Sequence, residues 1–371
     1  MLEHACGSRT DPWGQILHET YEPAGAGLGE RIVALGPECA PLAESVRRRG
    51  AGAVTGAGDT LYLATPATAT AARLRALDSE AASSTGGWGV VAGADAAAVH
   101  FALAKLQATP RPAPVGWAAV DGIHRRVVID GDECVWSDEH IVLALTRARL
   151  LVLIAHGEGA HANLSGVVVC GVVGDRERVA GRPITGGCIP GRRCKRARPG
   201  VVVIPARSIR ATEAILVSCN SFLVAPELYP SNSSLLLALV DGHARTVVGT
   251  RAPVDVGPGT LEHVVETLAV SPTWAAVVER LNDGGTRPGP FAVHGRPSEC
   301  PPRLRARRPN GFSDPVWPAE RTALQAAARR VESAGLLEAG DVAPPGRLVG
   351  AGPRPAGPPL ASGAAHRRAG W

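Results

Sequence analysis

The sequence predicts an α/β protein whose central sheet is mainly parallel. Short, continuous apolar runs such as Arg149–Ala155 (RLLVLIA) are typical of strands buried on both faces. These runs alternate with helical segments of about ten to fifteen residues, as in βαβ units. Hydrophobic residues make up 45% and charged residues 20% of the 371-residue chain, which suits a globular protein. Because aromatic residues make up only 4%, aliphatic side chains must fill the core.

The first third of the chain carries the weaker part of this pattern. Residues 1–30 are predicted to be loop, because Gly, Pro and polar residues follow one another there without periodicity. Strands are then predicted at 31–35 and 60–65, and helices at 41–49 and through 71–77. Pro66 suits the first turn of the second helix, since a helix lacks partners for its first N–H groups anyway. The polar stretch 79–87 is predicted to be a linker.

The alternation is stronger from residue 88 onward. Asp95 and Ser137 are suitable N-caps for two helices, which are predicted to end near Gln107 and Arg147. Further helices are predicted at 235–241, 260–268 and 273–281. Strands are predicted at 88–92, 117–120, 125–129, 149–155, 165–173, 201–204, 214–218, 245–249 and 291–294.

The chain divides into three predicted parts. Residues 1–85 form an N-terminal loop followed by a small α/β segment, and residues 86–297 form the main α/β domain. Residues 298–371 form a Pro/Arg-rich tail with one amphipathic helix at about 318–337. From residue 340 the tail has too few apolar side chains to offset the entropy of ordering, so we expect disorder there.

Composition narrows the function classes. Eight cysteines spread over this length do not form a disulfide scaffold. Residues 1–10 have no basic segment followed by an apolar one, so we expect no signal peptide, and no apolar run approaches the roughly 20 residues that span a membrane. We therefore expect a cytoplasmic protein with reduced thiols and no membrane partner. The net charge of +5 comes mostly from arginine, a bias typical of a high-GC genome. Without interleaved aromatics for base stacking, a nucleic-acid partner is not favoured.

Two strand ends carry the candidate chemistry. One strand runs into His156-Gly157, and another runs into Ser218-Cys219. In parallel α/β sheets, sites form at the carboxyl ends of strands. If these two strands are neighbours, His156 and Cys219 emerge side by side. Taken alone, a cysteine at a strand end is usually a small buried hydrophobe, and a histidine before glycine is usually a turn residue; their joint placement favours a site.

This pair suits nucleophilic catalysis. A cysteine thiol is only slightly ionised at neutral pH, and a nearby imidazole can accept its proton. Gly157 lacks a side chain, so its backbone N–H can approach a developing oxyanion, with the Cys219 N–H as a second donor. Such chemistry needs no cofactor and no metal.

The motifs resemble the CHAT domain of the caspase–gingipain–separase group of cysteine peptidases. The similar segments are Ile154–Gly157 (IAHG), Leu216–Cys219 (LVSC) and Leu235–Pro253 (LLLALVDGHARTVVGTRAP), and the strand Phe291–Gly295 (FAVHG) resembles the one that closes such domains. The resemblance covers about residues 86–297. It implies a caspase-like three-layer sandwich that cleaves a peptide bond of a protein or peptide substrate, through His156 and Cys219.

The resemblance also implies a pocket that selects the residue before the scissile bond, P1. An acidic lining would favour Arg or Lys, and Asp241 and Asp255 are candidates for it; either could instead be a solvated charge. The basic run Arg192–Arg196 lies between the two catalytic residues, where self-processing could occur. The chain departs from the family in having Ser218, where Ala is usual, and in lacking a helical-repeat domain. These departures bear on which substrate is cleaved and on how the enzyme is activated, for example by a regulatory protein partner, rather than on the fold.

Other classes fit less well. His156–Gly159 (HGEG) resembles the oxyanion loop of esterases, but no G-x-S-x-G elbow accompanies it, and no P-loop is present. A structural zinc could use Cys170, Cys188 and Cys194 with His161, although the spacing of Cys188 and Cys194 is wider than in zinc knuckles. A non-catalytic caspase-like scaffold is the main alternative to a peptidase.

Overall fold

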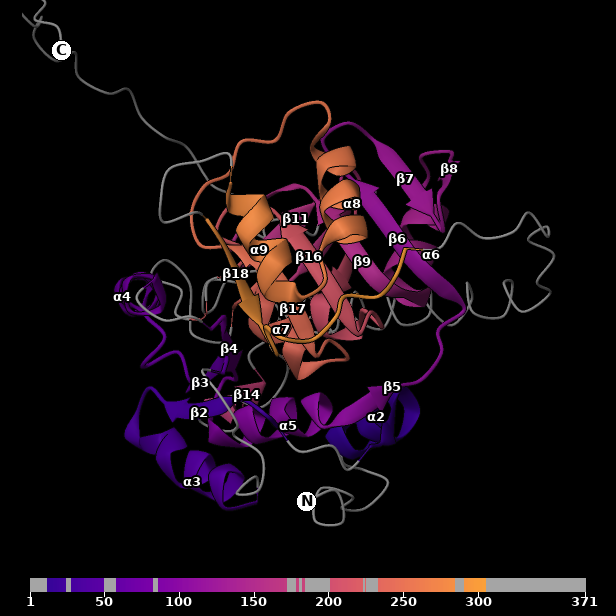
Figure 1. Ribbon diagram of the computed structural model, residues 1–371. Helices are drawn as coiled ribbons and strands as arrows, with labels where there is room; N and C mark the ends of the chain where they lie inside the picture. The colour runs from indigo at the N-terminus through magenta and orange to yellow at the C-terminus, as the bar shows by residue number, and fades with distance from the viewer. Residues whose placement is uncertain are drawn as a thin grey trace, which may run out of the picture.

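The protein is built around a large mixed β-sheet with helices on both faces (Figure 1). The computed structural model describes residues 12–24, 28–49, 58–82, 86–171, 178–179, 182–183, 201–222, 224, 233–283 and 290–304. Within these residues the sheet has ten strands, in the order β2 (Arg31–Ala34), β3 (Thr60–Ala64), β4 (Trp88–Ala92), β18 (Phe291–His294), β17 (Thr246–Thr250), β16 (Glu213–Val217), β9 (Ala148–Ile154), β6 (Val115–Asp121), β7 (Arg126–Ile129) and β8 (Asp132–Cys134).

Strand directions divide this sheet into two parallel blocks. Strands β2, β3, β4 and β18 run in one direction, and β17, β16, β9 and β6 run in the other. The blocks meet at the antiparallel pair β17–β18, and the meander β6–β7–β8 adds antiparallel pairs at one end. Most neighbours are therefore parallel, as the alternating pattern predicts, while the hairpins and the closing strand make the sheet mixed.

The main block has a three-layer arrangement. Helices α8 (Thr260–Val270) and α9 (Trp274–Asn282) cover one face, where they pack on side chains such as Ile154 and Val217 (Figure 1). Helices α6 (Asp138–Arg147) and α7 (Leu235–Asp241) pack against side chains of the other face. The strands are apolar on both faces because both faces are covered.

The N-terminal strands share this sheet rather than forming a separate one. Helices α3 (Ala40–Arg49) and α5 (Ala96–Leu106) pack on one face of β2, β3 and β4, and α4 (Ala71–Ala82) packs on the other. Short 3₁₀ turns, Pro37–Cys39 and Ala206–Ser208, precede α3 and follow β15 (Val202–Pro205). Because β4 and α5 pack with β2 and β3, the N-terminal core extends past the boundary expected at residue 86.

A smaller, four-stranded sheet begins where the chain leaves β9. It has the order β10 (His156–Glu158), β11 (His161–Asn163), β12 (Val167–Cys170) and β15. The first three strands are antiparallel, and β12 and β15 are parallel. The two-residue strands β13 (Arg178–Val179) and β14 (Arg182–Pro183) pair with each other. The rest of 172–200, including the basic run, lies outside the described residues.

Several local predictions are confirmed. The Asp95 side chain accepts a hydrogen bond from the Ala98 N–H at 2.8 Å, and the Ser137 hydroxyl accepts one from the His140 N–H at 3.2 Å, so both are N-caps. Strand β4, helix α7 and strand β18 have the predicted bounds. These elements have strong local signals, namely a capping residue or a short apolar run ended by polar residues.

Two predictions in the first third are wrong. Residues 12–23, predicted to be loop, form α2 (Pro12–Thr20) and β1 (Tyr21–Pro23), and β1 pairs with β5 (Ala108–Pro110). Helix α4 begins at Ala71 rather than near Pro66, since residues 66–68 form a turn, and it continues to Ala82 through part of the predicted linker. Helix α2 is stabilised mainly by docking: Ile16 and Leu17 are buried, and Trp13 stacks on Phe101 with ring centroids 4.9 Å apart.

The described residues end at 304, before the predicted C-terminal helix and tail. The helix expected at about 318–337 and the tail from 340 lie outside the described residues. Across the part of the chain that is described, every helix falls short of the length and hydrophobicity that crossing a membrane requires.

Buried polar side chains gather near the amino-terminal ends of β16 and β17. Glu213, the first residue of β16, lies 3.5 Å from both Arg149 and Arg245. Lys105 of α5 is fully buried, and its Nζ donates hydrogen bonds to the carbonyl oxygens of Val240, Gly242 (3.0 Å) and Ala244 (2.6 Å). Buried charges are tolerated only where partners replace the lost water, so these contacts fix the arrangement of the elements that carry them.

Two buried histidines make the stability of the protein sensitive to acid. Burial, together with the charges of Arg210, Lys105 and Arg207, lowers the pKa of His243 to about 3, and burial lowers the pKa of His294 to about 4. In the unfolded chain both titrate near 6.5. The unfolded state therefore binds more protons between these pH values, and the free energy of unfolding should fall as the pH falls from about 6.5 toward 4.

We expect each histidine to contribute roughly 2–4 kcal/mol to this loss. Urea unfolding between pH 7 and 4 measures it, and a His294→Gln variant should show a shallower decline than the unaltered protein. An equally steep decline in the variant would assign the acid sensitivity to other groups.

Candidate active site

The two candidate catalytic residues follow neighbouring strands. Strands β9 and β16 are parallel, with Ile154 opposite Val217, and the Ala155 N–H donates to the Val217 carbonyl oxygen at 3.1 Å. His156 and Cys219 each stand two residues beyond this last pair. Adjacent strands lie about 4.8 Å apart, so the structure brings the two residues to the same edge of the sheet.

The backbone also directs them to the same face. Ile154 and Val217 both belong to the core beneath α8 and α9. One residue separates the end of β9 from the start of β10, so the alternation of side chains with a period of two carries this direction on to His156. For Cys219 the contacts agree, because its Sγ lies 3.9 Å from the carbonyl oxygen of Val254 on that side. His156 is exposed and Cys219 is half-buried.

Gly157 packs directly against the residue before the cysteine. A Cβ on Gly157 would overlap the Ser218 hydroxyl oxygen and the His161 carbonyl oxygen. Besides the predicted oxyanion contact, there is thus a second reason for glycine at this position, since no side chain fits there. The contact between Gly157 and Ser218 holds the two strand ends, and so the backbones of His156 and Cys219, in register.

Hydroxyl groups brace the turn that carries Cys219. Asn220 has a positive φ of 56°, a left-handed conformation that Asn tolerates better than most residues. The Ser221 hydroxyl donates to the Leu216 carbonyl oxygen at 3.0 Å and accepts from the Thr250 N–H at 3.0 Å. The Thr250 hydroxyl donates to the Ser218 carbonyl oxygen. The end of β17 therefore fixes the turn on both sides of Cys219.

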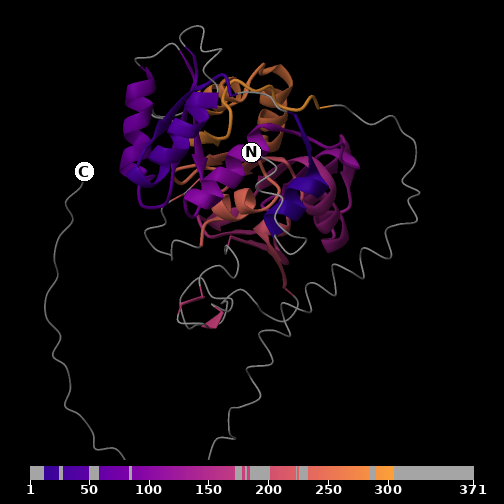
Figure 2. The same ribbon diagram turned by 90° about the horizontal axis from the view of Figure 1, so that it is seen from below.

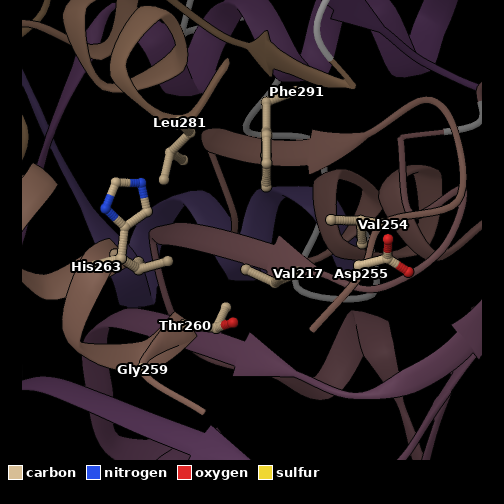
Figure 3. A pocket seen from close by; sticks show the side chains of 9 residues that line it. Val217, Val254, Asp255, Gly259, Thr260, His263, Leu281 and Phe291 are labelled. Carbon is tan, nitrogen blue, oxygen red and sulfur yellow. The ribbon is translucent and has the colours of Figure 1, made fainter. Parts of the chain in front are cut away.

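A pocket of about 290 Å³ opens beside this turn, between the sheet and the start of α8 (Figure 3). Figure 3 shows Val254 and Asp255 on one side and His263 and Leu281 on the other. Its apolar walls and few polar groups are typical of a site for a single side chain or small ligand. The lining residues are Val217, Val254, Asp255, Gly259, Thr260, His263, Val264, Leu281 and Phe291.

The structure separates the two acidic candidates for P1 recognition. Asp255 lines this pocket, close to Val254 and hence to Cys219. Asp241 does not: it is 5% exposed, it ends α7, and its Oδ1 accepts a hydrogen bond from Trp13 Nε1 at 2.9 Å. Helix α7 leads into β17, so its end lies at the amino-terminal edge of the strands, opposite Cys219. The expectation that Asp241 lines the substrate pocket is therefore wrong.

Sequence reasoning missed a second histidine at this edge. Asp121 ends β6, and its buried carboxylate accepts hydrogen bonds from the Ile123 and His124 N–H groups, each at 3.0 Å, and lies 2.8 Å from His124 Nδ1. The Gly122 N–H donates to the Ile154 carbonyl oxygen at 2.8 Å, which places this turn next to β9. The only signal in the sequence was the Asp-x-x-His spacing after a strand. Likewise, nothing in the sequence marked Ser221, Thr250 or His263.

The histidine and the thiol are not hydrogen-bonded to each other among the contacts of the described residues. Such bonds are often long in unliganded enzymes and tighten when substrate binds. The arrangement places a thiol, an imidazole and two backbone N–H groups at one strand edge beside a pocket. Chemically, this set can carry out nucleophilic attack on a carbonyl.

Of the four residues considered for a structural zinc, the structure describes His161 and Cys170. His161 and Cys170 are opposite each other in the β11–β12 pair. Cys188 and Cys194 lie outside the described residues, within which no group of three or more His, Cys, Asp or Glu side chains could hold a metal ion. The described cysteines Cys39, Cys134, Cys170, Cys219 and Cys300 form no disulfide.

Comparison with known proteins identifies no family and no similar curated protein. No protein-family model matches this chain, and no curated protein is significantly similar to it. The resemblance to the CHAT domain therefore rests on the motifs of this chain alone.

Proposed function

We propose that this protein is a caspase-like cysteine endopeptidase of the CHAT type, which acts in the cytoplasm on protein or peptide substrates. One observation supports this above all. The two strands that end in His-Gly and Ser-Cys are parallel neighbours, so His156 and Cys219 share a strand edge beside a pocket. The three-layer arrangement of the main block is consistent with such a fold.

In the proposed mechanism, Cys219 Sγ attacks the scissile carbonyl carbon after His156 accepts the thiol proton. The backbone N–H groups of Gly157 and Cys219 donate to the oxyanion of the tetrahedral intermediate. His156 returns the proton to the leaving amine, which leaves a thioester between Cys219 and the acyl part of the substrate. Water, activated by His156, hydrolyses this thioester and restores the thiol.

The pocket would hold the P1 side chain. Its depth is lined by apolar residues such as Val217, Val264 and Phe291, with Asp255 near Cys219 and exposed to solvent. A long side chain with a terminal cation fits this combination, because its methylene groups pack on the walls while the charge pairs with the carboxylate. We therefore propose Arg or Lys at P1.

Asp255→Asn tests this specificity. The amide keeps the size of the side chain and removes its charge, so kcat/KM for Arg and Lys substrates should fall about 10- to 100-fold, since bound substrate shields the pair from water and a hydrogen bond to a charged group is worth about 1.5–3 kcal/mol. Cleavage after Leu should change little. Peptide substrates that differ only at P1 measure the ratio, and an unchanged ratio would remove Asp255 from P1 recognition.

The function itself is tested by covalent labelling. The purified full-length protein is treated with acyloxymethyl ketone probes that carry Arg, Lys, Asp, Asn or Leu at P1, in parallel with the Cys219→Ala variant. Labelling that requires Cys219 and prefers one P1 residue would establish a cysteine peptidase.

A non-catalytic caspase-like scaffold is the second candidate. It is favoured by the lack of a hydrogen bond between His156 and Cys219 within the described residues. Folded protein that no probe labels at Cys219, and that still binds a partner when Cys219 is Ala, would support the scaffold instead.

A further inference from the structure

The N-terminal arm, residues 12–23, lies across the end of α7. Trp13 of α2 donates its indole N–H to Asp241, the last residue of α7. Just beyond that end, His243 receives two contacts from the arm: Thr20 Oγ1 lies 2.7 Å from its Nδ1, and the Tyr21 hydroxyl donates to its carbonyl oxygen. The arm therefore holds the chain where α7 turns toward β17. Figure 2 shows this end of the molecule, with α2 in indigo and α5 in purple on the side toward the viewer.

Helix α5 holds the same end from another side. The Lys105 ammonium donates to the Val240, Gly242 and Ala244 carbonyl oxygens, a position that suits a cation because a helix leaves its last carbonyls unpaired. Lys105 Nζ also lies 4.5 Å from the centre of the Phe101 ring, on which Trp13 stacks. The arm, α5 and the end of α7 therefore form one connected set of contacts.

The other end of α7 holds the histidine hairpin, residues 156–163. The Leu235 N–H donates to the Gly159 carbonyl oxygen at 2.6 Å, and Gly159 lies in the turn between β10 and β11. Gly171, at the end of β12, leaves no room for a Cβ, which would lie 2.5 Å from the Leu235 nitrogen. Every residue of α7 is buried, so the helix is confined along its length. A displacement of its far end must be accommodated at Leu235 and therefore at the hairpin.

The apolar side chains of the arm pack apart from the main core. Its buried side chains, Ile16, Leu17 and Tyr21, pack with Phe101, Ala104 and Ala108 in a small cluster of their own. The clusters on the two faces of the sheet contain none of these residues. Segments that pack through small peripheral clusters open at a lower free energy than the core.

We propose that residues 12–23 act as a detachable clamp on α7, and that the docked clamp keeps the hairpin bearing His156 in its catalytic position. When the arm is released, the end of α7 loosens and the hairpin becomes mobile, so the docked state is the active one. The coupling between arm and hairpin stands independently of the proposed peptidase activity; only its effect on cleavage rests on that function.

Trp13→Phe in the full-length chain tests the coupling, because the phenyl ring can still stack on Phe101 while the hydrogen bond to Asp241 is lost. Gln15→Ala is the matched control, since Gln15 is exposed on the same helix and its side-chain amide donates a hydrogen bond to Glu19 of α2 itself, at 2.7 Å. Hydrogen–deuterium exchange is followed in segments 12–23, 156–163 and 148–154.

We expect Trp13→Phe to raise exchange in 12–23 and in 156–163 by about tenfold, with 148–154 unchanged. Faster exchange of 12–23 alone would overturn the coupling. Faster exchange of 148–154 as well would mean global destabilisation and would also overturn it, as would an equal effect of Gln15→Ala. If the hairpin responds but neither the unaltered protein nor the variants cleave any substrate, the clamp stands and the peptidase proposal fails.

Discussion

Cys219→Ala should lower the rate of peptide cleavage at least about 1000-fold and abolish labelling by the ketone probes, while the protein stays folded. A nucleophile that forms the covalent intermediate cannot be replaced by a methyl group, and only oxyanion stabilisation and binding remain. Cys219 is half-buried, and within the described part of the chain its thiol makes a single weak contact, at 3.9 Å with the carbonyl oxygen of Val254. The free energy of unfolding should therefore change by less than about 1 kcal/mol.

Cys300→Ala is the matched control for this experiment. Cys300 is the exposed member of the described cysteines, so a reagent that merely follows accessibility would label it first. Labelling that survives Cys219→Ala and disappears in Cys300→Ala would show non-specific alkylation. Full activity in Cys219→Ala would exclude this thiol as the nucleophile and leave the Asp121–His124 pair as the next residues to examine.

Lys105→Met should cost about 3–5 kcal/mol of unfolding free energy, the largest stability effect we expect from one substitution. Methionine fills the volume of the lysine stem but leaves the Val240, Gly242 and Ala244 carbonyl oxygens without their donor. It also leaves Asp241 buried without the nearby positive charge. Urea unfolding at pH 7 measures the loss.

The double variant Lys105→Met/Asp241→Asn separates the charge effect from the packing effect. If the uncompensated Asp241 carboxylate causes part of the loss, the double variant should be more stable than Lys105→Met alone. Burial lowers the pKa of Lys105 to about 7, opposed by the charge of Asp241. The unfolded state then binds more protons between pH 7 and 10.5, so stability should rise with pH in this window in the unaltered protein and not in Lys105→Met. Equal pH dependence in both would show that Lys105 does not titrate there.

The pattern of apolar runs predicted the elements of the main block well. Strand β18 and helix α7 have the predicted bounds, because a short apolar run between polar residues or a Ser N-cap is a local signal. The neighbouring placement of β9 and β16, and with it the site, could be proposed from motif order. It could not be derived from periodicity, since strand pairing depends on contacts far apart in the sequence.

Predictions failed where docking outweighs local preference. Helix α2 is short and lies in a Gly- and Pro-containing stretch, and its Trp13 and Ile16 pack on side chains of α5, about 80 residues further along the chain. The case of Asp241 and Asp255 is different, because chain order alone could have separated them. Asp241 precedes β17 and Asp255 follows it, so the two must lie at opposite edges of a parallel sheet.

The parallel pairing of β4 with β18, two strands far apart in the sequence, has a consequence for synthesis on the ribosome. Residue 92, the end of β4, leaves the ribosome about 200 residues before β18, its partner in the sheet, has been made. At roughly 5–20 residues per second this delay lasts about 10–40 s. During that time the edge of β4, with Val90 and Val91, has no strand beside it, which invites pairing with another nascent chain. A trigger-factor-like chaperone, or slow spacing of translating ribosomes, would protect this protein most while residues 93–290 are being synthesised.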